Sequence, residues 1–223
     1  LDGELIATDA VGTYEATAPG LYTVQVTSAN GCESEMSAAF EVIQSGPASA
    51  IGQGYYVTEA FSDEQTITVL VEGYGQYEFR LDEDGPWQSS NVFTDVAPGY
   101  HTVFIRDVLT DFGCESDPLI GVSVIDYPKF FTPNGDGKND TWNIMGIAGQ
   151  PTAKIYIFDR YGKLLKQLSP SGPGWDGTYN GAPMPSSDYW FRVEYFEPDE
   201  LSGPDAVEDP RPLEFKAHFS LKR

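Results

Sequence analysis

The stretch APGLYTVQV at residues 18–26 returns, little changed, as APGYHTVFI at residues 97–105. In both copies the Pro-Gly pair predicts a turn, and the alternating residues that follow predict a β-strand. A Gly-Cys-Glu-Ser tetrapeptide follows each copy, at residues 31–34 and 113–116. The two motifs are offset by 79 and 82 residues. The sequence therefore contains a tandem repeat whose unit has the size of one small β domain.

Short runs of valine, isoleucine, threonine and aromatic residues recur along the whole chain of 223 residues. Such runs are typical of β-strands, and no window of the sequence has the periodicity of a helix. We therefore predict an all-β protein of tandem immunoglobulin-like β-sandwiches that ends in a small antiparallel β-sandwich. The expected domains are a partial immunoglobulin-like repeat at 1–44, a complete repeat at 48–126 and a third unit at 127–223.

The third unit is predicted from strands and the turns between them. Gly162 suits the left-handed position of a hairpin, and Asn180-Gly181 is the strongest single turn signal. The acidic, proline-rich residues 197–212 are expected to form an exposed loop. The expected strands are residues 154–159, 163–168, 188–196 and 213–223.

The net charge of −21 is divided unevenly between two parts of the chain. Residues 1–126 contain two basic and 21 acidic residues, whereas residues 127–223 contain eleven basic and thirteen acidic residues. The first part thus carries −19 and the second −2, which predicts different surfaces with different roles. Nucleic-acid binding is disfavoured, because phosphate contacts need clustered lysine and arginine. No apolar run is long enough for a membrane-spanning helix.

The two copies of the repeat carry the cysteines, Cys32 and Cys114, at equivalent positions. Equivalent positions of tandem modules rarely meet, so no bridge between these cysteines is expected. Each is predicted to be a small buried residue or to have a partner outside the chain. Because residues 1–44 are short for a whole sandwich, the chain is also expected to be the C-terminal part of a longer protein.

Four ordered blocks of the third unit resemble a known family. Together they resemble the gliding motility-associated C-terminal domain, which is the type B C-terminal signal of cargo for the type IX secretion system of Bacteroidota. The resemblance covers residues 127–223, and the repeats upstream are similar to the immunoglobulin-like or PKD-like modules of long surface adhesins. The blocks read FFTPNGDGKNDTWNI from residue 130, KIYIFDRYGKLL from residue 154, GWDGTYNGAPMPSSDYWFRV from residue 174 and FKAHFSLKR from residue 215.

The resemblance implies a role without catalysis. The chain is expected to be the C-terminal region of a large secreted cell-surface protein, an adhesin of the gliding type, whose final domain is a secretion and surface-retention signal. The implied partners are the outer-membrane type IX translocon, its shuttle barrel and an outer-membrane protein resembling SprF or PorP. The implied location is the cell surface, reached by secretion through the outer membrane, without membrane insertion by the chain itself.

The family motifs fall mainly on turns and strand ends. Two departures from the family pattern are present: Ser187 stands where the family has glycine, which removes a flexible turn position, and the insertion at 197–212 lengthens the last connection. The signal-motif residues that the resemblance implies are Thr132, Pro133, Asn134, Gly135, Asp136, Gly137, Asn139, Asp140, Arg160, Tyr161, Gly162, Trp175, Asp176, Gly177, Gly181, Tyr189 and Arg223.

The stretch NGDGKND at residues 134–140 admits two interpretations. Asn134, Asp136 and Asp140, with the carbonyl of Lys138, have a spacing that partly resembles a calcium loop. The full pattern fails, since the twelfth position counted from Asn134 is Met145 and not glutamate. The alternative is an Asx-rich turn that enters the first strand of the unit. No organic cofactor or other metal is expected, and calcium at this loop is the one candidate ligand.

An enzyme is not expected. His101 lies in a repeat strand and His218 on the solvent-facing side of the last strand, and neither has a nucleophile near it in sequence. The adjacent acids Asp82, Glu83 and Asp84 are interpreted as a solvated turn and not as a glycosidase pair.

The aromatic residues of the third unit also admit two interpretations. The favoured one places the 154–168 hairpin, with Tyr156 and Phe158 opposite Ile155 and Ile157, between two layers of the core. The other makes one face or a free edge of the unit a docking surface. This second interpretation supports an alternative function, in which the unit is a carbohydrate- or protein-binding adhesin module stabilised by calcium.

Overall fold

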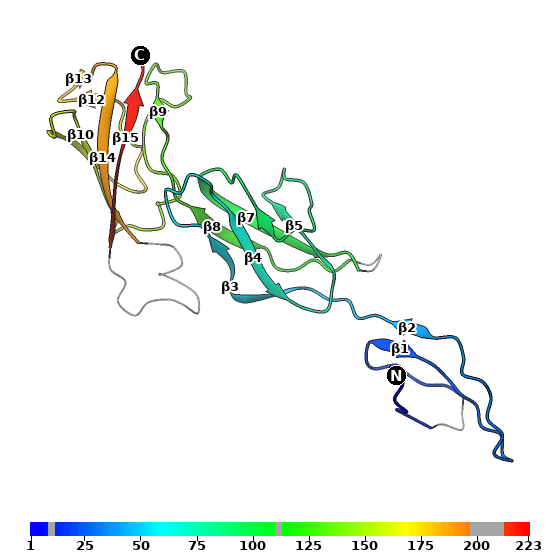
Figure 1. Ribbon diagram of the computed structural model, residues 1–223. Coiled ribbons are helices and arrows are strands. Elements are labelled where there is room, and N and C mark those ends of the chain that lie inside the picture. The colour runs from blue at the N-terminus through cyan, green and yellow to red at the C-terminus, as the bar shows by residue number, and fades with distance from the viewer. Residues whose placement is uncertain (9–11, 110–112, 197–211) are drawn as a thin grey trace.

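The computed structural model describes residues 1–8, 12–109, 113–196 and 212–223 of the chain. These residues form fifteen β-strands and no helix, in five sheets arranged along an elongated molecule (Figure 1). The prediction of an all-β fold is confirmed. In the described ranges, no helix is long and apolar enough to cross a membrane. The predicted loop at 197–212 falls almost wholly on residues 197–211, which lie outside the described residues.

The N-terminal part of the chain contains one short ladder. Two strands pair antiparallel, β1 (Gly20–Tyr22) and β2 (Phe40–Val42). The strand predicted over 18–26 therefore ends earlier than expected, because the N–H groups of Val24 and Val26 donate to serine hydroxyls at 2.9 and 3.0 Å and not to a partner backbone. No described residue of 1–44 is buried, so this ladder has no core of its own.

Residues 49–124 form a sandwich of two antiparallel sheets, with strand orders β3-β4-β6 and β5-β7-β8. Both sheets contribute to one core, in which Ile67, Val103 and Val122 are fully buried. This division of strands between two sheets is typical of immunoglobulin-like sandwiches. The strands are β3 (Ser49–Val57), β4 (Ile67–Glu72), β5 (Tyr77–Leu81), β6 (Val92–Phe93), β7 (Gly99–Asp107) and β8 (Leu119–Val124). We call this sandwich the middle module.

Asp107, which is only 1% exposed, joins the linker before the middle module to the end of β7. Its carboxylate accepts hydrogen bonds from the Ser45 hydroxyl and from the N–H groups of Gly46, Gln76 and Leu109. Burial raises the pKa of Asp107, but these hydrogen bonds to the charged form outweigh it, so the pKa lies below the ordinary value of 3.8. The carboxylate thus fixes where the linker meets the module.

The terminal domain is built on a five-stranded sheet with the order β11-β10-β14-β15-β9 and a separate β12-β13 hairpin. All its pairings are antiparallel except that of β9, which runs parallel to β15. β11 and β9 are the outermost strands of the sheet. The strands are β9 (Phe130–Phe131), β10 (Lys154–Phe158), β11 (Leu164–Leu168), β12 (Thr178–Tyr179), β13 (Ala182–Pro183), β14 (Ser187–Tyr195) and β15 (Leu213–Leu221).

One face of this sheet carries the core of the terminal domain. Trp142 and Trp175, both fully buried, lie on the segments between strands and cover the sheet. The Trp142 ring stacks on Phe219 with 3.9 Å between ring centroids and 11° between planes. The sheet residues beneath them are at most 1% exposed and include Ile155, Ile157, Phe191, Val193 and Phe219.

Among the described residues, no second layer covers the opposite face of the sheet, which corrects the favoured interpretation of the hairpin as a strand between two layers. Tyr156 and Phe158 on this face are half-buried, and Trp190 is 42% exposed. The strand register places Phe158 beside Trp190 and Trp190 beside His218. In β10 the isoleucines face the covering segments, which within the described residues pack on their side of the sheet.

In the described part of the chain, two tyrosines and one histidine each contact the carbonyl of the residue four positions earlier, an alanine or a proline. Tyr22 Oη donates to the Ala18 carbonyl at 2.7 Å, and His101 Nε2 lies 2.7 Å from the Ala97 carbonyl. Tyr189 Oη donates to the Pro185 carbonyl at 2.8 Å. Such tyrosine corners are a hallmark of immunoglobulin-like domains. The terminal domain thus shares a local feature with the repeats that precede it.

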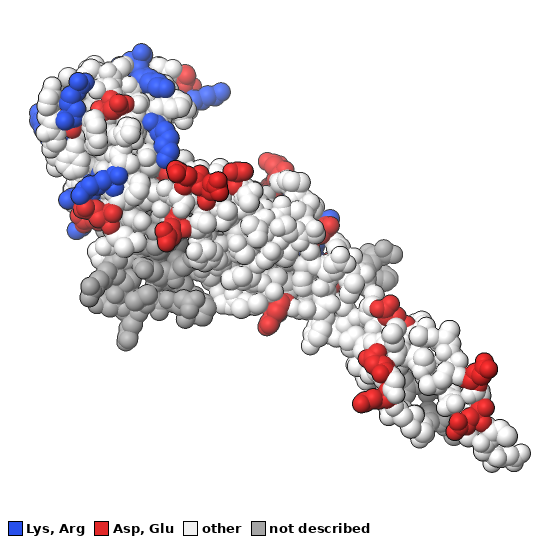
Figure 2. All heavy atoms as spheres, in the orientation of Figure 1, with Lys and Arg blue, Asp and Glu red and all other residues white. Residues whose placement is uncertain are grey.

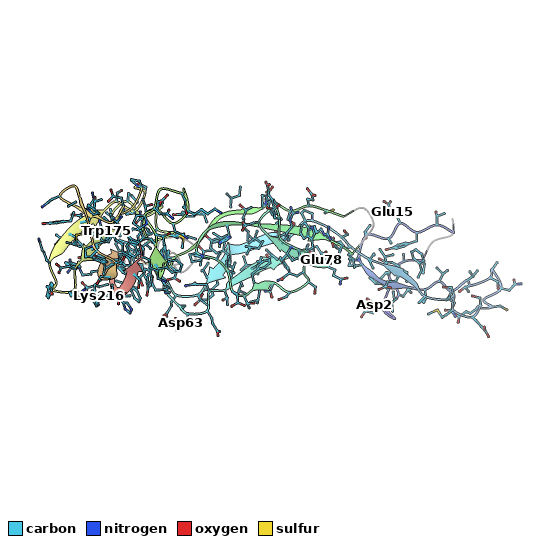
Figure 3. All side chains as sticks on the ribbon, turned by 90° about the horizontal axis from the view of Figure 1, so that it is seen from above. Asp2, Glu15, Asp63, Glu78, Trp175 and Lys216 are labelled. Carbon is cyan, nitrogen blue, oxygen red and sulfur yellow. The ribbon has the colours of Figure 1, made fainter. Side chains whose placement is uncertain are left out.

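The predicted difference in surface charge is visible in space (Figure 2). Acidic side chains are spread over the N-terminal part and the middle module, whereas lysine and arginine side chains gather on the terminal domain. The described residues of the terminal domain contain ten basic and seven acidic residues. Seen from above, Trp175 and Lys216 lie at one end of the molecule and Asp2 and Glu15 at the other (Figure 3).

The cysteines of the two repeats are free thiols in the structure. Cys32 is exposed, so the expectation that it is buried is wrong, because the N-terminal ladder has no core to cover it. Cys114 is half-buried next to the end of β7.

Candidate recognition site at the distal end of the terminal domain

The distal end is the end of the five-stranded sheet away from the middle module, where β10 and β15 end and β14 begins (Figure 1). The loop at residues 132–140, the β10–β11 turn, the β12–β13 hairpin and Arg223 all lie there. The signal-motif residues are thus drawn from four separate stretches of sequence.

The loop at residues 132–140 is closed by its own side chains. Asn134 Oδ1 accepts a hydrogen bond from the N–H of Asp136, and Asp136 Oδ1 accepts one from the N–H of Lys138. Asp140 accepts from the N–H groups of Gly135 and Gly137, at 2.6 and 2.7 Å. These two backbone hydrogen bonds hold the pKa of Asp140 below its ordinary value of 3.8. The loop therefore has the geometry of an Asx-rich turn.

The four candidate calcium ligands lie together in this loop, but side-chain oxygens of Asn134, Asp136 and Asp140 are directed at backbone N–H groups. An oxygen from Asn134, one from Asp136 and both from Asp140 already accept hydrogen bonds. In the described part of the chain, no group of three or more His, Cys, Asp or Glu residues is placed to hold a metal ion. Calcium at this loop stays a prediction, and the hydrogen bonds alone account for its shape.

The turn between β10 and β11 is organised by Asp159, which the sequence analysis did not select. Its carboxylate accepts hydrogen bonds from the N–H groups of Tyr161 and Lys163, both at 2.9 Å. Gly162 has a φ of +77°, as its place in the hairpin predicts. The Tyr161 side chain is 86% exposed at the tip of the turn. An aspartate just before an exposed Arg-Tyr-Gly turn is the sequence signal for this role.

Trp175 and Gly177 form the inner part of the distal end. Trp175 exchanges backbone hydrogen bonds with Trp142 and donates from its indole N–H to the Thr178 carbonyl. A hydrogen bond from the Thr178 hydroxyl lowers the pKa of Asp176, and this outweighs the effect of its burial. Gly177 has a φ of +74°, and a Cβ at this position would lie 2.7 Å from the side chain of Leu221. Only glycine fits here without displacing a neighbour.

Arg223 ties the end of β15 to the β12–β13 region. Its guanidinium donates to the carbonyls of Met184 and Gly177, both at 3.1 Å. Its backbone N–H donates to the hydroxyl of Ser186 at 3.0 Å. The side chain therefore joins the end of β15 to the residues before and after the β12–β13 hairpin.

Tyr189 and the segment before it complete the distal end. The Tyr189 ring lies edge-on to Trp175, with 4.9 Å between centroids, and burial raises the pKa of its hydroxyl. Ser187 does not have a left-handed φ, so the expected loss of a flexible turn position at this residue has no cost in the structure. Arg160 donates to the Ser187 hydroxyl at 2.8 Å. A hollow of about 330 Å³ lies between this segment and Tyr161.

Gly181 and Asn180 form the turn of the β12–β13 hairpin. Both have left-handed φ values, +78° and +52°, as the sequence signal predicts. A Cβ at Gly181 would meet nothing within 4 Å. Unlike Gly177, this glycine is needed for backbone conformation and not for space.

The residues weighed for catalysis lie elsewhere and are held by structural hydrogen bonds. His101 Nδ1 lies 2.7 Å from the Asp82 carboxylate, and its other ring nitrogen meets the Ala97 carbonyl. Asp82 also accepts from the N–H of Thr102, and its pKa lies below the ordinary value because these hydrogen bonds outweigh burial. His218 is exposed on the open face. Among the described residues, neither histidine forms a hydrogen bond to a hydroxyl or thiol.

Comparison with known proteins relates the terminal domain to a known family. Residues 125–203 match the model of the CHU_C type IX secretion signal domain. No curated protein matches the chain. Among solved structures, the FN1–FN3 domains of chicken CNTN1 are 12% identical, with 88% of this chain and 77% of that chain covered and a TM-score of 0.26. So low a TM-score supports no argument about domain arrangement.

Proposed function

We propose that the terminal domain directs export and that its distal end is the surface read by the export machinery, because residues 125–203 match the type IX secretion signal domain family. The immunoglobulin-like modules before it are cargo. On this proposal the chain is the C-terminal region of a gliding-type adhesin that is secreted through the outer membrane and kept at the cell surface.

The convergence of the motif residues at the distal end is the observation that carries this proposal. Gly177 and Arg223 are far apart in sequence, yet a guanidinium hydrogen bond joins them. The acids of the distal end accept backbone hydrogen bonds and so define loop shapes. A family pattern that preserves the shape of exposed loops suits recognition by another protein better than it suits chemistry.

The proposed partners are the outer-membrane type IX translocon, its shuttle barrel and an outer-membrane protein resembling SprF or PorP. The distribution of charge supports a division of labour between the two parts of the chain. Strong negative charge on residues 1–126 keeps this part of the chain solvated and makes neighbouring molecules repel one another. The less charged terminal domain, with Tyr161 exposed at its tip, is free to dock on a protein surface.

An export assay with matched tyrosine variants tests the proposal. A reporter fused before residues 1–223 is expressed in a host that carries a type IX system, alongside the same fusion ending at residue 126. We expect export of the first fusion alone. Tyr161→Ala should reduce export at least about tenfold, because a hot-spot aromatic contributes about 2 kcal/mol or more to binding. Tyr74→Ala, which changes a tyrosine that is 70% exposed on the middle module, is the control and should leave export unchanged.

The open face of the sheet supports a second candidate function, a carbohydrate- or protein-binding adhesin module. Leu164, Phe158, Trp190 and His218 form a row across four neighbouring strands. Aromatic side chains in a row give a flat apolar surface with polar neighbours. This candidate predicts that the fusion ending at residue 126 is exported normally, whereas Trp190→Ala abolishes adhesion.

A further inference from the structure

The loop at residues 58–66, between β3 and β4, belongs to the middle module in sequence but packs into the terminal domain. Phe61 at its tip is 8% exposed and is part of the terminal-domain core, not of the middle-module core. Asp63, two residues further on, lies on the side of the middle module nearer the terminal domain (Figure 3). One aromatic side chain thus crosses from one domain into the other.

The Phe61 ring occupies a site that we call the aromatic socket, formed by Tyr127, Phe191, Tyr195 and Phe215. The ring stacks on Phe215 with 4.1 Å between centroids and 7° between planes. It meets Tyr195 edge-on at 5.2 Å and lies 6.2 Å from Tyr127 and 6.5 Å from Phe191. Three of the socket residues come from β14 and β15, the central strands of the terminal sheet.

The loop is built to hold Phe61 in an unfavourable backbone conformation. Phe61 has a φ of +64°, which is rare for a bulky residue and persists only where the surroundings enforce it. Its N–H donates to the Ile125 carbonyl at 2.9 Å. Gln65, 5% exposed, accepts from the Thr58 hydroxyl and donates to the Ser62 carbonyl, which braces the loop from within.

Two further contacts connect the same domains away from the socket. Gly149 donates its N–H to the hydroxyl of Tyr100, at 2.5 Å, and the Ser123 hydroxyl donates to the Gly146 carbonyl at 2.6 Å. A Cβ at Gly146 would lie 2.2 Å from the Val124 carbonyl oxygen. The backbones therefore approach closely, and the two domains are in contact at this junction as well as at the socket.

We infer that the folded signal unit extends beyond the family match and includes the loop at residues 58–66, with Phe61 completing the core of the terminal domain. Without the ring, the socket residues of β14 and β15 lose a buried aromatic neighbour. The terminal domain is therefore fully stable only when the middle module is folded. Resting on the proposed function, this makes display of the export signal depend on prior folding of the domain that precedes it.

Hydrogen exchange of the purified chain, residues 1–223, tests this coupling without any export assay. Phe61→Gly removes the ring but suits the φ of +64°, so the loop of the middle module keeps its conformation. We expect amide exchange in β14 and β15 to accelerate about a hundredfold, as for other buried Phe truncations. Phe61→Leu, whose apolar side chain still occupies part of the socket, should accelerate exchange in β14 and β15 less.

Phe93→Ala is the matched control, because Phe93 is 7% exposed in the core of the middle module itself. It should accelerate exchange chiefly in β4 and β6. Unchanged exchange of β14 and β15 in Phe61→Gly would overturn the inference, whatever the export assay gives. Normal export of a Phe61→Gly fusion despite accelerated exchange would overturn the dependence of signal display on folding.

Discussion

At the scale of single residues, four aspartates act as acceptors for backbone N–H groups. Asp140, Asp159 and Asp176 each close a distal loop, and Asp107 fixes the linker before the middle module. Each of these carboxylates receives at least two hydrogen bonds, and for Asp107, Asp140 and Asp176 these hydrogen bonds favour the charged form and lower the pKa. The turns therefore take their shape from charge as well as from glycine.

Asp140→Asn tests whether hydrogen bonds or calcium hold the loop at residues 132–140. Because the pKa of Asp140 is lowered by its hydrogen bonds, the stabilisation is complete above the ordinary value of 3.8 and is lost as pH falls through the lower pKa of the folded state. At pH 7 we expect Asp140→Asn to lower Tm equally in calcium and in chelator. The wild type should show the same Tm in both, measured by calorimetry, and a rise with calcium would instead support a metal site.

At the scale of elements, the sequence predicted turns correctly where a residue is needed for its left-handed backbone conformation. Gly162 and the Asn180-Gly181 pair have the predicted left-handed φ values, and the alternating residues of β15 have the predicted buried face. Phe61 could not be predicted, since its role depends on neighbours that only the folded chain supplies. Asp159 was missed although its partners, the N–H groups of Tyr161 and Lys163, are close in sequence and its place before the turn is a signal for this role. The open face of β10 was also mispredicted, because its outward aromatic residues look like core residues in sequence.

Two glycines of the distal end allow space and backbone conformation to be separated. Gly177 and Gly181 have nearly equal φ values of +74° and +78°, but only Gly177 is crowded, by Leu221 among others. Gly181→Ala should cost about 1 kcal/mol of unfolding free energy, from the left-handed backbone alone. Gly177→Ala should cost about 2–4 kcal/mol, because overpacking adds to the same penalty. Urea unfolding of both variants gives the comparison, and equal costs would contradict the packing at Gly177.

At the scale of the whole molecule, the parts of the chain are joined in different ways. The middle module and the terminal domain share buried side chains at the aromatic socket. The N-terminal ladder has no buried residue in its described part and meets the middle module through the linker that Asp107 holds. Unfolding of the terminal domain should therefore be coupled to unfolding of the middle module, whereas unfolding of the N-terminal ladder should not affect the middle module.

Removal of residues 1–43 tests this difference, since it spares Ser45 and Gly46, the linker residues that bind Asp107. We expect the free energy of unfolding of the remaining chain to change by no more than about 0.5 kcal/mol, as for other surface changes. The measurement is chemical denaturation followed by tryptophan fluorescence, which reports on the buried Trp142 and Trp175. A much larger loss would mean that the ladder supports the modules after it.

The position of β11 at the end of the terminal sheet has a consequence for handling the protein. An outermost strand presents unpaired N–H and C=O groups to which a strand from a neighbouring molecule can add, and lysines along it discourage such addition. Lys163 and Lys166 flank Leu164 there. Concentrated samples in high salt, where the repulsion between these lysines is screened, should form dimers by edge-to-edge pairing, and acetylation of the lysines should promote the same dimers at low salt.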